Sequence, residues 1–189
     1  MSTLPDWMIP PRPEGWFAAD LDDLPDAPRH TELIDGSLIF TMSPQRRWHM
    51  EVVDALRSAL RAQAPENYRV DREMTVVLDE RNRPEPDVIV STSPYKGDQT
   101  WIPAETVELV VEVVSPESAE RDRHMKPLKY AAAGIRSMWL VDDEDGAPVV
   151  SVYELDATTG AYTRTQVARG SLRTPLPFDV EIDLATLTP

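Results

Sequence analysis

Short apolar runs along the 189-residue chain predict a series of β-strands separated by polar turns. Residues 107–114 form the most apolar run, and nearly continuous β-branched side chains are typical of a central strand covered on both faces. An Asp-Gly pair between two apolar runs predicts a hairpin over residues 31–40. Further strands are predicted at residues 68–78, 86–91, 137–141, 149–155, 162–167 and 178–182.

Two stretches have the apolar period of a helix that packs on one face. The first covers residues 45–63 and ends before Pro65, and its apolar face consists of Trp48, Val52, Leu56, Ala59 and Leu60. A second helix is predicted within residues 118–133, because Gly134 stands in the usual place of a C-cap. A shorter helix is expected within residues 16–24.

The order of these elements predicts an α/β fold of the mixed α+β type, with one mixed β-sheet flanked by helices and extended by β-hairpins. Six prolines among residues 5–28 exclude a long helix near the start of the chain. We therefore expect residues 1–30 to be a Pro-rich N-terminal leader packed on a single domain that is formed by residues 31–189.

Composition excludes several classes of protein. The chain has no cysteine, which excludes disulfides, thiolate zinc sites and a cysteine nucleophile. Its 41% hydrophobic and 28% charged residues are typical of a globular protein. No run approaches the roughly 18 apolar residues that a membrane span needs, and the first residues lack the pattern of a signal peptide. We expect a cytoplasmic protein without a membrane partner.

Two acidic residues, one inside an apolar strand and one at the start of another, are the first candidates for catalytic or metal-binding roles. Glu112 lies inside the most apolar strand, where an unpaired carboxylate costs several kcal/mol, so it is paired, protonated or metal-bound. Asp87 follows Pro86 at the start of a short apolar strand. Carboxylates from adjacent strands can converge on a hard cation such as Mg²⁺. The alternatives are an ion pair with an arginine for Glu112 and a solvated strand end for Asp87.

Lys126 is the third candidate, and it lies in the charged segment 120–130 that follows the Glu112 strand. An ammonium near a metal-bound water can orient it or stabilise developing negative charge. The alternative is a solvated helix face, which Lys129 fits better.

Further candidates are of second rank. Glu32 precedes the predicted Asp-Gly turn and can add a carboxylate or anchor His49, which lies on the edge of the first helix's apolar face. The alternative for His49 is a hydrogen-bonded structural role. Candidate phosphate contacts, which would position a duplex without reading its sequence, are Arg46, Arg47, Arg121, Arg123 and His124. Neither a Gly-rich phosphate loop nor a nucleophile elbow is present, which argues against NTPases and α/β-hydrolases.

Pro86-Asp87, Glu112 and a following lysine form the acid-acid-lysine pattern of the PD-(D/E)XK nuclease superfamily. In the usual pattern the lysine follows the second acid by two residues, a position that Val114 holds here. Longer motifs resemble the Uma-type family of restriction endonucleases, in which the lysine lies on the next helix, as Lys126 does. These motifs are Glu32-Leu33-Ile34-Asp35-Gly36, Ser43-Pro44 with His49, Pro86-Asp87-Val88-Ile89-Val90, Glu112-Val113-Val114-Ser115-Pro116-Glu117-Ser118, Asp122 through Lys126 to Tyr130, Ala133-Gly134-Ile135 and Trp139-Leu140-Val141-Asp142.

This resemblance implies a restriction-endonuclease-like core and hydrolysis of DNA phosphodiesters with Mg²⁺ or Mn²⁺. Asp87 and Glu112 would hold the metal together with the Val113 carbonyl, and Lys126 would position the attacking water. A homodimer is implied because nucleases that cut two strands often act as two subunits. The open alternatives are a catalytically silent binding or scaffold protein and a metal-dependent hydrolase of another phosphate substrate.

The distribution of charge qualifies the expected contact with DNA. A net charge of −14 argues against a protein that coats nucleic acid. Residues 44–63, however, hold four arginines against two acids, and residues 115–136 hold five basic residues against three acids. Both predicted helices are thus locally positive, while the rest of the chain sums to −18. We expect DNA binding that is weak and sensitive to salt.

Overall fold

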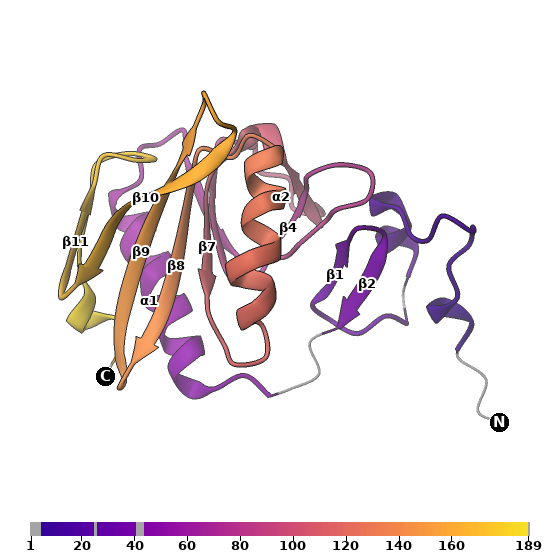
Figure 1. The fold of residues 1–189 in the computed structure, drawn as a ribbon, viewed down its shortest axis with the longest axis horizontal. Coiled ribbons are helices and arrows are strands. Elements are labelled where there is room, and N and C mark those ends of the chain that lie inside the picture. The colour runs from indigo at the N-terminus through magenta and orange to yellow at the C-terminus, as the bar shows by residue number, and fades with distance from the viewer. Residues whose placement is uncertain (1–4, 25, 41–43, 189) are drawn as a thin grey trace.

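The computed structural model describes residues 5–24, 26–40 and 44–188, and a mixed six-stranded sheet lies at its centre (Figure 1). From one edge to the other, its strands are β10 (Ala161–Arg169), β9 (Ala147–Asp156), β8 (Ser137–Glu144), β7 (Val107–Val113), β5 (Val88–Ser91) and β3 (Arg69–Arg72). β7 and β8 are parallel, and the other neighbouring pairs are antiparallel. The predicted mixed α+β class is confirmed.

The two faces of the sheet are covered by different helices. On one face, α1 (Arg47–Gln63) buries its apolar side chains against β7 and β8, in a core that includes Leu56, Val111 and Trp139. On the other face, α2 (Lys126–Ala132) places Tyr130 against Val110. The central strand β7 is therefore buried on both faces, as its continuous apolar sequence predicts.

Three two-stranded ribbons surround the sheet. They are β1 (Thr31–Ile34) with β2 (Ser37–Phe40), β4 (Thr75–Val77) with β6 (Trp101–Pro103), and β11 (Ser171–Thr174) with β12 (Val180–Asp183). Short 3₁₀ helices lie at Asp6–Met8, Ala18–Asp23, Ala104–Thr106 and Leu184–Thr186. Within the described ranges, no helix is both long and apolar enough to cross a membrane.

Several strand boundaries differ from those predicted. The single strand expected over residues 68–78 is broken, because Glu73 adopts a positive φ of 50° and directs the chain out of the central sheet into β4. β4 then pairs in parallel with β6, in a segment that has no strand signal. β11 was not predicted either, and β8 continues to Glu144, beyond its apolar run. The prediction of one sheet was thus too simple.

The β1–β2 hairpin is held against the domain at its Asp-Gly turn. Gly36 has a φ of +77° and lies so close to the guanidinium of Arg81 that a Cβ there would collide with it. Arg81 in turn donates hydrogen bonds to the carbonyl oxygens of Asp35 (3.1 Å) and Glu14. The register of this hairpin places Glu32 opposite Ile39, on the strand nearer the rest of the protein.

We expect Gly36→Ala to lower the free energy of unfolding by about 2–4 kcal/mol, because it adds left-handed strain and displaces hydrogen-bonded Arg81. Gly160→Ala is the matched control, since Gly160 also has a positive φ (67°) in a hairpin turn but no atom lies within 4 Å of its Cβ position. That variant suffers only the strain, about 1–2 kcal/mol. Chemical denaturation measures both, and equal destabilisation would show that the contact with Arg81 is unimportant.

Candidate active site

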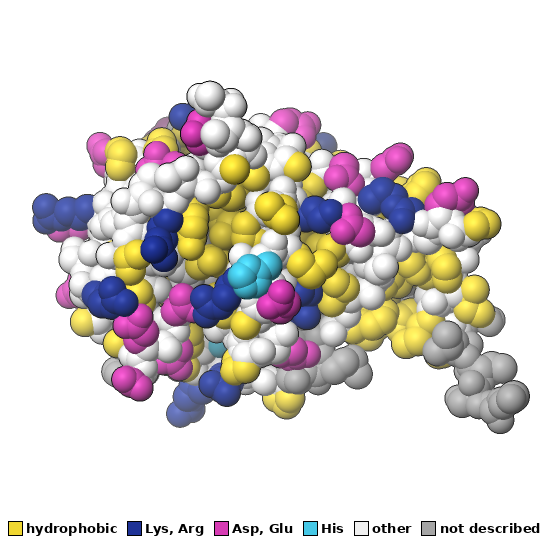
Figure 2. Space-filling model, viewed as in Figure 1, with side chains coloured by type: hydrophobic (Ala, Val, Ile, Leu, Met, Phe, Trp, Pro, Cys, Tyr) yellow, Lys and Arg dark blue, Asp and Glu magenta, His cyan; other side chains and the backbone are white. Residues whose placement is uncertain are grey.

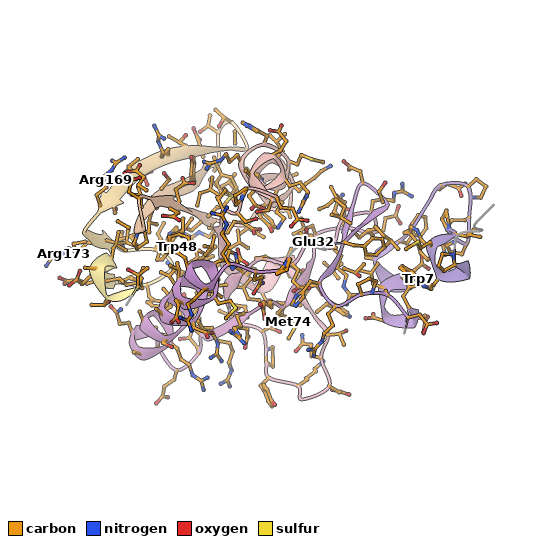
Figure 3. The ribbon with its side chains drawn as sticks, turned by 90° about the horizontal axis from the view of Figure 1, so that it is seen from below. Trp7, Glu32, Trp48, Met74, Arg169 and Arg173 are labelled. Carbon is orange, nitrogen blue, oxygen red and sulfur yellow. The ribbon has the colours of Figure 1, made fainter. Side chains whose placement is uncertain are left out.

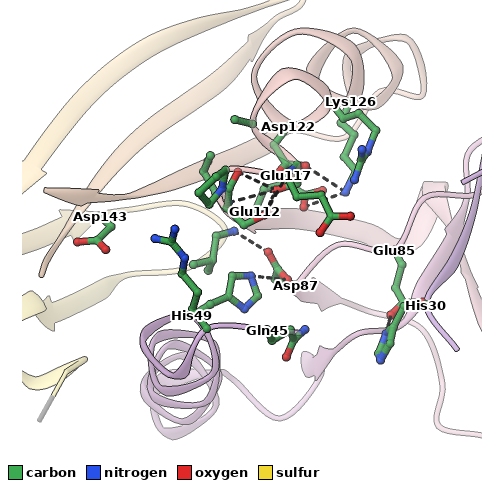
Figure 4. A pocket seen from close by; sticks show the side chains of 18 of the residues that line it. His30, Gln45, His49, Glu85, Asp87, Glu112, Glu117, Asp122, Lys126 and Asp143 are labelled. Atoms are coloured by element: carbon green, nitrogen blue, oxygen red, sulfur yellow. Dashed lines mark hydrogen bonds and ion pairs between the residues drawn. The ribbon is translucent and has the colours of Figure 1, made fainter. Parts of the chain in front are cut away.

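A cleft of about 730 Å³ lies where β1, the start of α1, the start of β5 and the end of β7 meet (Figure 4). Its walls include Glu32 from the β1 side and Trp48 from the α1 side (Figure 3). Asp87, Glu112 and Lys126 all line it. The fold therefore brings together three candidate residues that are distant from one another in the chain.

The register of the sheet explains why Asp87 and Glu112 are neighbours. β5 and β7 are antiparallel, with Val88 opposite Val111. The next position along, Asp87, therefore falls beside Glu112, and opposite residues of an antiparallel pair share a face. The Oδ2 atom of Asp87 accepts a hydrogen bond of 2.6 Å from the backbone N–H of Val113.

Glu112 is buried, with 2% of its surface exposed. Its Oε1 accepts a hydrogen bond of 2.6 Å from the hydroxyl of Tyr130, and its Oε2 accepts one of 3.0 Å from Nζ of Lys126. Burial raises the pKa of Glu112 well above its ordinary value, although the charge of Lys126 opposes the shift. The sequence left open whether Glu112 is paired, protonated or metal-bound. In the structure it is paired, and its partner is a lysine rather than an arginine.

Lys126 is surrounded by carboxylates. Its Nζ lies 2.9 Å from Oε1 of Glu32, 3.0 Å from Oε2 of Glu112 and 3.3 Å from Oδ1 of Asp122. Burial acts to lower the pKa of Lys126, but the charges of Glu112, Glu32 and Asp122 outweigh it and raise the pKa well above its usual range. Lys126 is therefore a buried cation rather than part of a solvated helix face.

A π-helical turn, Arg121–Met125, directs Lys126 into the cleft. The backbone N–H of Lys126 donates to the carbonyl oxygen of Arg121, five residues back. Pro127 has no backbone N–H, so it cannot donate the i→i−4 hydrogen bond of an α-helix. The wider π-helical turn therefore leaves no backbone donor unsatisfied at this position. Asp122 and Lys126 lie on the same side of this wide turn and both face Glu112.

His49 is placed by α1 on the second oxygen of Asp87, with 3.3 Å between Nε2 and Oδ1. Burial acts to lower the pKa of His49, but hydrogen bonding to Asp87 and the charge of Asp87 raise it overall. Of the two roles open to Glu32 from sequence, it does not anchor His49. Glu32 adds a carboxylate to the cleft instead, since it reaches Lys126 and the backbone N–H of Glu85 (2.8 Å).

The candidate phosphate contacts divide into two groups. Arg46, Arg121 and Arg123 line the cleft, and Nη2 of Arg123 is 2.5 Å from Oδ1 of Asp142. Arg47 and His124 are not among the lining residues. His124 is exposed, and its Nε2 lies 3.9 Å from the Oε2 atom of Glu120.

Sequence reasoning assigned no role in the cleft to four residues. Asp122 and Tyr130 were named only as the ends of a family motif; they lie four residues before and after Lys126, and this i, i+4 spacing could have identified them as one helix stripe. The other two are His30 and Glu85, with 2.5 Å between Nδ1 and Oε1. No local signal joins these two residues, because they are 55 positions apart.

The donor set has the chemistry that a hard divalent cation takes, because it consists of carboxylate oxygens. Glu32, Glu112 and Asp122 surround one ammonium, so negative charge is in excess in a buried place. Among the described residues, no three His, Asp or Glu side chains are arranged as a ready-made metal site. A site with one or two carboxylates and several waters, as Mg²⁺ commonly has, does not need three.

The fold has similar members among solved structures. No curated protein matches the chain. Its fold is similar to the crystal structure of a putative nuclease of DUF820 from Anabaena variabilis, with a TM-score of 0.67, 18% identity, and coverage of 89% of this chain and 95% of that one. A weaker likeness joins it to P. aeruginosa NucC in a cAAA-bound form, with a TM-score of 0.32, 12% identity, and coverage of 65% and 85%.

Residues 18–186 match the family model Uma2, described as "Putative restriction endonuclease". This match confirms the resemblance that the motifs indicated, and it spans more of the chain than those motifs do. The chain belongs to the Uma2 family.

Proposed function

We propose that this protein hydrolyses phosphodiester bonds of DNA with the help of a divalent cation, Mg²⁺ or Mn²⁺. The observation that carries the proposal is the convergence of Asp87, Glu112 and Lys126 in one cleft of a chain that belongs to a restriction endonuclease family. Buried, mutually interacting ionisable groups in a cleft are typical of catalytic sites.

Asp87 and Glu112 are the residues proposed to hold the cation. When bound, such a cation polarises the phosphate and lowers the pKa of a water ligand. Asp87 is fixed for this task by the Val113 N–H and by His49. Glu112 is fixed by the hydroxyl of Tyr130.

Lys126 is the proposed third catalytic residue. Its ammonium is buried and therefore acts in a medium of low effective dielectric, where a positive charge strongly stabilises an anion. A phosphodiester gains negative charge on its non-bridging oxygens as a nucleophile attacks. We infer that Lys126 stabilises that charge at the Asp87–Glu112 end of the cleft.

Arg46, Arg47, Arg121, Arg123 and His124 are the proposed contacts to the DNA backbone. Basic and acidic side chains are interspersed on the face shown in Figure 2, without a continuous basic surface. Arg123 is also partly neutralised by Asp142. Binding through so few cations is weak and falls as salt rises.

The wider organisation belongs to the same proposal. Cutting both strands of a duplex requires two cleavage events, which the two copies of this cleft in a homodimer would supply. We propose a cytoplasmic homodimer in which residues 1–30 are a leader on a single domain of residues 31–189. The contact of Trp16 and Ala18 with Leu33 supports the docking of that leader.

We expect Asp87→Asn to reduce cleavage of duplex DNA in Mg²⁺ or Mn²⁺ by roughly 100-fold or more, because it removes one of the two carboxylates proposed to hold the cation. The wild-type protein should also lose activity when the cation is chelated. Gel assays of plasmid cleavage measure both effects. Asp98→Asn is the control, since Asp98 is exposed and lies outside the cleft.

The other possible results of the cleavage assay each contradict a different part of the proposal. Equal cleavage by the wild-type protein and Asp87→Asn would show that Asp87 has no role in catalysis. A folded wild-type protein that cuts no DNA in either cation would favour the silent scaffold. Hydrolysis of small phosphodiesters without cleavage of DNA would favour a hydrolase of another phosphate substrate.

Salt dependence tests the backbone contacts independently of cleavage. Fluorescence anisotropy with a labelled duplex in chelator, between about 50 and 200 mM salt, gives the slope of log K against log[salt]. We expect the double variant Arg46→Gln, Arg47→Gln to make this slope shallower by up to about 2 units, one for each phosphate that an arginine no longer neutralises. Arg173→Gln, which changes an arginine paired with Glu181 on the β11–β12 ribbon, should leave the slope unchanged.

A further inference from the structure

The ammonium of Lys126 is already surrounded by carboxylates within the protein. An ammonium has three N–H donors and no acceptor. Three carboxylate oxygens lie around it at 2.9, 3.0 and 3.3 Å, from Glu32, Glu112 and Asp122 respectively. The side chains of all three acids are at most 6% exposed. One donor of Lys126 is hydrogen-bonded to Glu112, and the ammonium forms ion pairs with Glu32 and Asp122, so it is held by three buried acids.

Glu112 therefore has two competing roles. It is a proposed cation ligand, yet its Oε2 accepts from Lys126 and its Oε1 accepts from Tyr130. A divalent cation that binds Glu112 must approach an ammonium held on the same carboxylate. Like charges at such a separation repel strongly in a buried site.

Glu32 and Asp122 provide a place for Lys126 that does not depend on Glu112. Glu32 is fixed on β1 by the backbone N–H of Glu85. Asp122 is four residues before Lys126 on the same π-helical turn. Both acids are buried.

We propose that Asp122 and Glu32 are positioning residues that retain the ammonium of Lys126 when Glu112 exchanges it for a divalent cation. The exchange replaces one contact of three and frees one N–H of Lys126 for the substrate phosphate. This inference rests on the proposed function, since it concerns the same cleft. It adds that Lys126 weakens cation binding, and that Asp122 controls how much.

The first test uses Mn²⁺ alone as the probe, with the full chain, in isothermal titration calorimetry. Lys126→Met removes the competing charge, and we expect it to bind Mn²⁺ at least about tenfold more tightly than the wild-type protein. Lys129→Met is the matched control, because Lys129 is one turn further on and pairs with Asp35. It should change the affinity less than twofold. Mn²⁺ binding by Lys126→Met that is no tighter than wild type would overturn the proposal.

Lys126→Gln is the second variant, for use if Lys126→Met does not fold, because glutamine remains polar among the three acids. Circular dichroism establishes that each variant is folded before titration. The glutamine variant should also bind Mn²⁺ more tightly than the wild-type protein. Weaker or equal binding by a folded Lys126→Gln would count against competition.

The second test is a double-mutant cycle that separates positioning from direct ligation. We expect Asp122→Asn to weaken Mn²⁺ binding at least threefold more in the wild-type background than in the Lys126→Met background, because Asp122 acts through the lysine. Equal weakening in both backgrounds would show that Asp122 acts on the cation itself, and would overturn its assignment.

Parallel assays of DNA cleavage keep this inference distinct from the proposed function. Tighter Mn²⁺ binding by Lys126→Met, together with a wild-type protein that cuts no DNA, supports the inference and contradicts the proposed nuclease activity. Cleavage by the wild-type protein without tighter Mn²⁺ binding by Lys126→Met supports the nuclease activity and contradicts the inference. Absence of Mn²⁺ binding by both folded proteins would overturn both.

Discussion

The rest of the site depends on one constraint, the burial of the Glu112 carboxylate within the central strand β7. A charge in that position needs partners, and removing one partner of a buried pair typically costs about 3–5 kcal/mol. The partners Lys126 and Tyr130 both come from α2, which packs on the same face of the sheet. The position of α2 is thus fixed by polar contacts at its start as well as by its apolar side.

The remaining residues of the cleft are held by separate parts of the fold. Antiparallel register brings Asp87 beside Glu112, and α1 brings His49 to Asp87. The indole Nε1 of Trp48 donates to the carbonyl oxygen of Gly146, at 3.0 Å, which joins the first turn of α1 to the β8–β9 turn. The cleft is consequently framed by elements that are each anchored elsewhere, which favours a pre-organised site.

Local patterns predicted what depends on local sequence. Helix α1 and strands β5 and β7 follow from apolar periodicity, and Glu112 was identified because an acid interrupts an apolar run. Contacts between distant segments left no such trace, so sequence alone did not identify Asp87 as the partner of His49. The break at Glu73 was missed for a different reason, since a positive φ at a non-glycine residue is imposed by tertiary structure.

The π-helical turn before α2 has a consequence for how such sites are found in other chains. The lysine of the motif is usually located by counting residues from the second acid, and here that count ends at Val114. Lys126 instead meets Glu112 from a helix 14 residues later, at a depth set by helix phase. Spatial reach, rather than sequence spacing, is therefore the property to search for in distant members of this fold.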